Sequence, residues 1–302
     1  AHCLATVAVG EVNRGELEAS VRAGRAALKI GREINNEWSQ AIASTNLGHG
    51  LTEEGRYGEA LRAAQEGVRI ARKLPNPMLL LLALYSLGNA HQAVLGLEEA
   101  QTMYQEALEI ADTLPRTWRS LMVRSLCANR ALADDREAAH RYALESVEIR
   151  DAAPRRLMWL DFARYHETEA LLRGGNEELA REDVKRLGER VGGDRRFRLV
   201  HLRMRAVLAE WDGKTGEALT RLQEARALAA EIGLPGELWQ IWAALGELHE
   251  QRGEPEEAHG AFSRAARIVE RLAGEIEDEA LKEGFFSVPQ LRRVLEASAR
   301  KP

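Results

Sequence analysis

The sequence predicts an all-α solenoid of about seven antiparallel helix pairs that ends in a capping helix. Its composition favours helices, with 45% apolar and 29% charged residues but only 5% aromatic ones. Small residues recur in columns at a period close to 40 residues. The 302 residues are also close to the usual limit for one compact core, a limit that a repeat array avoids because its core grows along one axis.

The repeat frame rests on one small residue in the second helix of each pair. This anchor stands at Ser20, Ala60, Ala100, Ala139, Ala180, Ala218 and Ala258, with spacings of 40, 40, 39, 41, 38 and 40 residues. Five residues earlier is the expected turn position, occupied by Gly15, Gly55, Leu95, Asp134, Gly175, Gly213 and Gly253. Glycine predominates there because it adopts turn conformations that cost other residues more.

Two further columns of mostly small side chains keep the same frame. Twelve residues before the anchors stand Ala8, Gly48, Gly88, Cys127, Thr168, Ala206 and Gly246. Seven residues after them stand Ala27, Gly67, Ala107, Ser146, Leu187, Ala225 and Ala265. Small side chains let helices approach closely, and Pro75, Pro115 and Pro154, each 15 residues after an anchor, are expected to end the second helix. A bundle of unrelated helices would show the 3.6-residue period without the 40-residue one.

These columns resemble the tetratricopeptide repeat, in which small residues are separated by the same 12 and 7 positions. The period of about 40 resembles the long-helix variants of kinesin light chains and bacterial sensor regions. Glu167 and Arg205 stand where that family usually has Leu. The best-matching repeat is the seventh, with Trp242, Leu245, Gly246, Gly253, Ala258, Phe262 and Ala265 in frame. The resemblance implies a right-handed superhelix over residues 1–273.

Residues 274–302 break the pattern and are expected to form a separate capping segment, an acidic helix followed by a short amphipathic one. A terminal repeat needs such a cap over its exposed apolar face. Phe285, Phe286 and Leu291 are the side chains expected to cover it. This ending is similar to those of repeat regions in bacterial signalling ATPases and cyclase-linked regulators.

Motifs that resemble catalytic or metal sites are incomplete. The run 212–215 resembles the end of a phosphate-binding loop, but Leu208 occupies the place of the required glycine. His166 and Glu167 begin like a metalloprotease helix, but Ala170 stands where the second histidine is needed. We therefore expect no enzyme activity, no metal and no cofactor.

The charge balance bears on partners and compartment. The net charge of −5 and pI near 6 give no general attraction to nucleic acid, although residues 192–205 are rich in Arg. No apolar run reaches the roughly 20 residues that a membrane span requires. The two cysteines, Cys3 and Cys127, are far apart, which favours a reducing cytoplasm over a disulfide framework.

In the family that the chain resembles, the first helix of each pair lines a concave groove. Carried over by frame, the groove residues are Thr45, His49, Tyr85, Asn89, Gln92, Arg124, Tyr165, Glu169, Arg173, Arg203 and Glu210, with Thr52, Glu247 and Glu250 beside them. Such polar and aromatic side chains suit a peptide, a protein or a small polar ligand. The alternative for any single residue is an ordinary hydrated surface.

Two functions remain open. The chain resembles the C-terminal sensor region of the maltose-regulon activator and related ATPase regulators, in which a bound ligand would alter contacts with an upstream effector or ATPase domain of the same polypeptide. The first residues already have the pattern of a helix, so we expect an excised piece of a longer protein. The alternative is a constitutive assembly scaffold that binds a partner peptide, as kinesin light chain repeats do.

Overall fold

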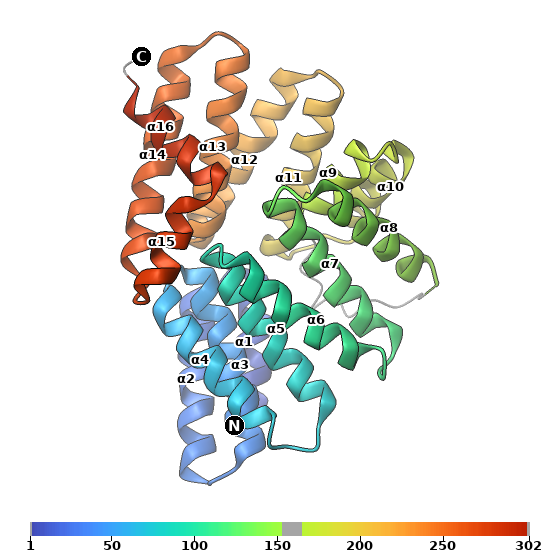
Figure 1. The fold of residues 1–302 in the computed structure, drawn as a ribbon, viewed down its shortest axis with the longest axis vertical. Coiled ribbons are helices and arrows are strands. Elements are labelled where there is room, and N and C mark those ends of the chain that lie inside the picture. Colours follow the sequence, from blue (N-terminus) through green and yellow to red (C-terminus); the bar gives the residue numbers. More distant parts are fainter. Residues whose placement is uncertain (1, 153–164, 301–302) are drawn as a thin grey trace.

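The computed structural model describes residues 2–152 and 165–300, and within these ranges the chain is helical almost throughout (Figure 1). Seven sequential antiparallel pairs are followed by two shorter helices. The pairs are α1 (His2–Arg14) with α2 (Leu17–Glu33), α3 (Glu37–Glu54) with α4 (Tyr57–Ala71), α5 (Pro77–Ala93) with α6 (Leu97–Ala111), α7 (Arg116–Leu132) with α8 (Arg136–Ala152), α9 (Tyr165–Arg173) with α10 (Glu177–Gly188), α11 (Arg195–Trp211) with α12 (Thr215–Ile232), and α13 (Pro235–Gln251) with α14 (Pro255–Gly274). The predicted solenoid is confirmed.

The turns inside the pairs confirm the register. All seven predicted turn positions have positive φ, from +54° at Leu95 to +81° at Gly15 and Gly175. Asp134, with φ of +57°, holds the same left-handed backbone as the glycines. An L-residue with a side chain pays roughly 1–2 kcal/mol for that conformation, so Leu95 and Asp134 keep the turn at the expense of local strain.

The three small-residue columns are buried at every position in all seven repeats. A methyl group placed on Gly88 would lie 2.5 Å from Cε1 of Tyr104, and one on Gly246 would lie 2.8 Å from Cζ of Phe262. The glycines therefore make room for an aromatic ring from the second helix of the same pair. This is the close approach for which the columns were expected to be small.

Prolines follow the second helices where the frame places them. Helix α4 ends at Ala71 and α6 at Ala111, and Pro75 and Pro115 lie in the connections that follow. Pro154 lies outside the described residues. No helix in the described ranges is long and apolar enough to cross a membrane.

The C-terminal segment forms α15 (Glu279–Ser287) and α16 (Pro289–Ala299). The acidic stretch that begins at Glu275 is a connection rather than the start of a helix, because α15 begins only at Glu279. Phe285 and Leu291 are fully buried and Phe286 is half-buried. Helix α16 packs on α14, and the side-chain amide of Gln290 donates to the carbonyl of Leu132 at 2.9 Å. The segment thus covers the last repeat and also reaches the end of α7.

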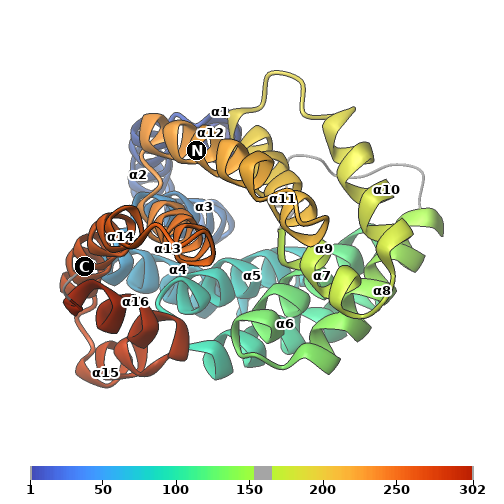
Figure 2. The ribbon, with the colours of Figure 1, turned by 90° about the horizontal axis from the view of Figure 1, so that it is seen from above.

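The superhelix turns far enough for its last repeats to rest on its first ones. Viewed from above, the helices form a closed circuit in which α13 lies against α3 and α11 against α1 (Figure 2). We call this contact the closing seam. It consists of Gly15, Glu16, Glu53, Gly55, Gly58 and Arg62 on the first repeats and Arg195, Arg196, Glu231, Ile232, Pro235, Leu272, Glu275 and Glu277 on the last ones.

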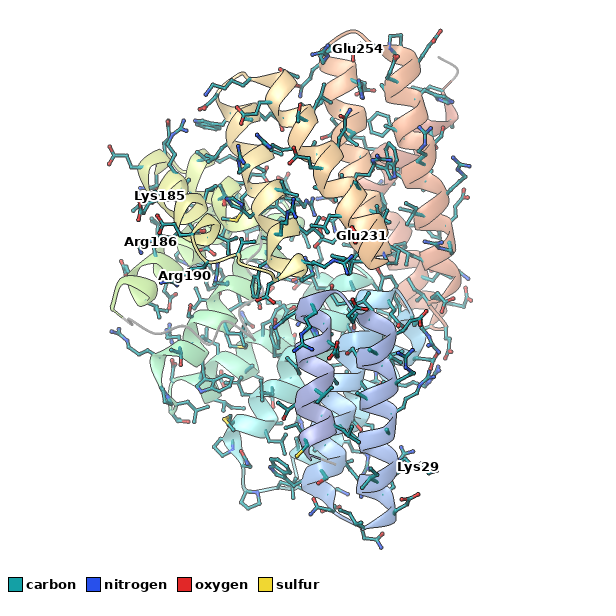
Figure 3. All side chains as sticks on the ribbon, turned by 180° about the vertical axis from the view of Figure 1, so that it is seen from behind. Lys29, Lys185, Arg186, Arg190, Glu231 and Glu254 are labelled. Atoms are coloured by element: carbon teal, nitrogen blue, oxygen red, sulfur yellow. The ribbon has the colours of Figure 1, made fainter. Side chains whose placement is uncertain are left out.

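A backbone hydrogen bond crosses the closing seam. The amide of Gly58, in the first turn of α4, donates to the carbonyl of Glu275 at 2.9 Å. Amides in the first turn of a helix have no partner within the helix, so this bond satisfies a group that water would otherwise hydrate. An ion pair between Arg62 and Glu277 lies beside it. Elsewhere on the closing seam Arg195 lies 3.5 Å from Glu16 and 2.8 Å from Glu231 of its own side. Figure 3 shows Glu231 where α12 meets the first repeats.

Candidate functional site

An interior cavity of about 120 Å³, partly open to solvent, lies where the first and last repeats meet. First helices of the second to seventh pairs contribute side chains to its wall. The lining consists of His49, Thr52, Glu53, Tyr57, Asn89, Gln92, Ala93, Leu95, Leu132, Tyr165, His166, Arg196, Val200, Arg203, Leu234, Gly236, Glu237, Trp239 and Gln240. Helices α3 and α5 contribute residues from their C-terminal halves, and α11 and α13 contribute residues from their N-terminal halves. These halves meet at the closing seam, so the cavity exists only when the seam is formed.

Four charged side chains form a continuous chain through this wall, which we call the charge chain. Arg196 donates from Nε to Glu53 and from Nη2 to Glu237, each at 2.9 Å. Glu237 also accepts from Arg203, whose Nη1 reaches Oε1 of Gln240 at 3.2 Å. Arg196 and Arg203 share one face of α11 because seven residues make two helical turns. Glu237 follows Pro235 in the first turn of α13, and Glu53 lies across the closing seam on α3.

Two members of the charge chain, Glu237 and Arg196, are held in their ionised forms at neutral pH. Burial raises the pKa of Glu237, but the charges of Arg196 and Arg203 outweigh burial and lower it to about 2. Burial lowers the pKa of Arg196, and Glu53 and Glu237 more than offset this. Removing one partner of such a buried pair costs about 3–5 kcal/mol, because the remaining charge is left uncompensated.

Tyr165 supports the charge chain from α9. The guanidinium of Arg203 lies 3.6 Å from the centre of its ring, and its hydroxyl donates to Oε1 of Gln240 at 3.2 Å. Burial raises the pKa of Tyr165 to about 12, so the hydroxyl stays protonated and remains a donor. The ring of His166 lies 4.0 Å from that of Tyr165, between ring centres. These contacts hold Arg203 and Gln240 in one orientation.

The opposite wall is neutral and comes from α5. Tyr104, fully buried on α6, donates its hydroxyl to Oδ1 of Asn89 at 2.8 Å and lies 3.4 Å from Oε1 of Gln92. Tyr104 is the same ring that Gly88 accommodates. The small-residue column therefore positions the two amides of this wall.

Five of the eleven predicted groove residues line the interior cavity: His49, Asn89, Gln92, Tyr165 and Arg203. Thr52, named beside them, does so too. They come from four different helices, which the closing seam brings together.

The structure places the other six elsewhere. Thr45 lies between α3 and α4, where its hydroxyl donates to the carbonyl of Ala41. Tyr85 is buried, with its ring centre 6.4 Å from that of Tyr104. The remaining ones, Glu169, Arg173, Glu210 and Arg124, form side-chain pairs away from the cavity wall.

Arg124 is the clearest departure from the predicted groove. Its side chain is only 3% exposed and pairs at 2.6 Å with Glu167, which is 2% exposed. Glu167 is the residue that stands where the tetratricopeptide pattern has Leu. The two polar residues compensate each other between α7 and α9, so Arg124 serves packing between repeats and not the cavity.

Sequence reasoning missed Glu53, Arg196, Glu237 and Gln240. A signal for two of them existed, since Arg196 precedes Arg203 by two turns and Gln240 precedes Glu247 by two turns on the same helix faces. The described part of the chain holds no group of three or more His, Cys, Asp and Glu side chains placed to bind a metal ion. The cavity offers charged and neutral hydrogen-bonding groups.

No family model matches the sequence, and no curated protein sequence matches it either. Solved structures do match. A Rap protein complexed with competence and sporulation factor has a TM-score of 0.71 at 15% identity, covering 90% of this chain and 75% of that one. The apo form of RapI has a TM-score of 0.64 at 12% identity, covering 89% and 98%. This chain has a tetratricopeptide-like fold.

A third similar structure is the Cut9–Hcn1 hetero-tetramer of the APC/C. Its TM-score is 0.57 at 12% identity, and the match covers 98% of this chain and 55% of that one. At such identities these likenesses concern the fold.

Proposed function

We propose that this chain is a ligand-binding scaffold that receives a peptide, a segment of a protein or a small polar molecule in its interior cavity. The observation that carries the proposal is the charge chain in the cavity wall. Buried charges and amides cost free energy unless they are paired, and an apolar wall would hold the repeats together at lower cost. A wall that retains two Arg, two Glu and three amide side chains is suited to recognition.

The position of the cavity supports a sensing role. Glu53 belongs to the first side of the closing seam and Arg196 to the second, so an occupant that contacts either residue acts on the seam. A ligand shifts a conformational equilibrium by the difference between its affinities for the two states. A ligand that prefers the closed circuit would therefore tighten the seam, and one that prefers the open form would release it. The similar Rap protein, solved with competence and sporulation factor, supports binding by this fold.

We extend the proposal to a sensor region of a larger bacterial signalling protein, in which an upstream ATPase or effector domain receives the change. The resemblance of the repeat frame and of the C-terminal segment to such regulators supports this extension. A phosphate-binding loop encoded before Ala1 in the parental gene is the expected finding. A parental gene without any effector domain would contradict it.

The test uses the amide of Gly58 as a reporter of the closing seam. Polar metabolites and short peptides are screened for a shift in melting temperature, and each hit is followed by hydrogen exchange at Gly58. We expect a ligand to change that exchange rate, and we expect the Asn89→Ala, Gln92→Ala double variant to lose affinity. The matched control, Thr102→Ala with Thr220→Ala, alters two exposed positions and should bind as the unchanged chain does.

Constitutive assembly is the second candidate function, favoured by the likeness to the Cut9–Hcn1 complex. A scaffold of this kind would bind a partner protein on its outer surface. Binding of such a partner would leave the exchange rate of the Gly58 amide unchanged. The Asn89→Ala, Gln92→Ala double variant would bind the partner with the same affinity as the unchanged chain. That outcome would replace the sensor proposal.

A further inference from the structure

We infer that the ligand of the interior cavity is a net-neutral zwitterion of amino-acid size, whose carboxylate binds Arg196 and whose ammonium binds Glu53. The inference rests on the proposed function and narrows its ligand class. Three properties of the cavity carry it: its size, its balance of charge and the unused hydrogen-bonding capacity of Arg196.

Size selects a small molecule over a peptide while the closing seam is formed. The cavity measures about 120 Å³. An engineered protein cavity of about 150 Å³ binds benzene, which has six heavy atoms. The space therefore fits a ligand of roughly five or six heavy atoms. A peptide of several residues would require the last repeats to move away from the first ones.

Charge balance selects a net-neutral ligand. Among the described lining residues, Arg196 and Arg203 carry positive charge and Glu53 and Glu237 carry negative charge, so the fixed charges cancel. A ligand with a net charge would bury an uncompensated ion, which costs several kcal/mol in a protein interior. A zwitterion has no net charge, and its two ends can each face a side chain of opposite sign.

Arg196 supplies the partner for the carboxylate. Its side chain is 91% buried and lies in the cavity wall, and its Nη1 atom has no hydrogen-bond partner among the described residues. Its Nε and Nη2 atoms are already fixed by Glu53 and Glu237. A guanidinium has five N–H donors in a rigid plane, so the two fixed atoms also fix Nη1. Nη1 is covered by the cavity wall, so the carboxylate must displace this cover to bind it.

Glu53 supplies the partner for the ammonium. Its Oε2 accepts the bond from Arg196, and a carboxylate has acceptor capacity on both oxygens. Its side chain is 14% exposed, so it is held close to the cavity rather than extended into solvent. Carboxylate and ammonium of an amino acid are separated by one carbon atom, which suits two partners that are themselves hydrogen-bonded to each other. Asn89 and Gln92 on the neutral wall are left to contact the side chain of the ligand.

The test compares amino acids with analogues that lack one charged end, on the unchanged full chain. The twenty L-amino acids are screened by thermal shift, and each hit is titrated by calorimetry beside its two analogues. For L-alanine these are propionate, which lacks the ammonium, and ethylamine, which lacks the carboxylate. We expect at least one amino acid with a neutral side chain to bind, and each analogue to bind at least tenfold more weakly. Equal binding of an amino acid and its analogues would overturn the inference.

A matched pair of variants tests the role of Arg196. Arg196→Lys keeps the charge opposite Glu53 and Glu237 but removes the forked donors, and we expect at least a tenfold loss of affinity for the amino acid. Arg267→Lys makes the same change at an exposed position on α14 and should leave affinity unchanged. Unchanged affinity of Arg196→Lys would assign the carboxylate to another residue and overturn the inference.

Peptides separate failure of this inference from failure of the proposed function. If amino acids do not bind but a peptide from the screen does, and the Asn89→Ala, Gln92→Ala pair weakens that peptide, the ligand class is wrong and the scaffold proposal stands. If neither amino acids nor peptides bind in the cavity, both are overturned.

Discussion

Gly55→Ala tests whether the closing seam forms in solution. Gly55 has φ of +79°, and an added Cβ would lie 2.6 Å from Cγ of Pro235 and 2.7 Å from Cδ2 of Leu272. The left-handed backbone alone costs an alanine about 1 kcal/mol. Overpacking against the two side chains adds about 1–3 kcal/mol. We expect a total destabilisation of about 2–4 kcal/mol.

Gly213→Ala is the matched control, because Gly213 occupies the same turn position with φ of +71° and its Cβ would meet nothing within 4 Å. We expect it to cost only about 1 kcal/mol, from the backbone conformation. Urea denaturation of the two variants measures the difference, and hydrogen exchange at Gly58 should accelerate in Gly55→Ala alone. Equal destabilisation with unchanged exchange would show that the first and last repeats are apart in solution.

Three further predictions concern the charge chain and the repeat frame. The lowered pKa of Glu237, about 2 against an ordinary 4.5, contributes about 3 kcal/mol at neutral pH. This contribution is lost as pH falls from about 5 toward 2. The difference in free energy of unfolding between the unchanged chain and Glu237→Gln, measured by urea denaturation at several pH values, should therefore shrink over that range. A constant difference would contradict an ionised Glu237. Asp134→Gly should raise the free energy of unfolding by about 0.5–1 kcal/mol, because it relieves a left-handed L-residue whose side chain is exposed; a loss of stability would argue against that turn. Gly88→Arg should destabilise by about 2 kcal/mol or more through its clash with Tyr104, and an unchanged melting temperature would refute the register.

The local parts of the fold were predictable because they depend on residues close in sequence. Turn positions, buried columns and the ends of α4 and α6 all follow from one 40-residue frame. The frame located a turn even at Leu95, a residue type that gives no turn signal of its own. Closure of the circuit was not predictable in the same way. It depends on small rotations between neighbouring repeats that accumulate over the whole array.

In the candidate site, too, positions within single helices were predictable from the sequence and contacts between distant repeats were not. Two predicted groove residues, Asn89 and Arg203, line the cavity, and the frame identifies the first-helix face on which they lie. Arg124 also lies on the first helix of its pair. Its side chain pairs with Glu167 of the next repeat, so it is buried between α7 and α9. Glu237 was not predicted because it pairs with two Arg side chains of α11, and a frame for single helices does not predict contacts between helices of different repeats.

The bond between Gly58 and Glu275 changes how the array should respond to stress. In an open solenoid each repeat contacts its neighbours alone, so stability spreads as a one-dimensional sum and the ends fray first. Here the second repeat and the end of the seventh hold each other, so the seventh repeat is supported by the second as well as by the sixth. Unfolding of the last pair would remove support from the first ones without passing through the middle of the chain. The described repeats should therefore melt together, with cooperativity set by the circuit as a whole rather than by the number of repeats.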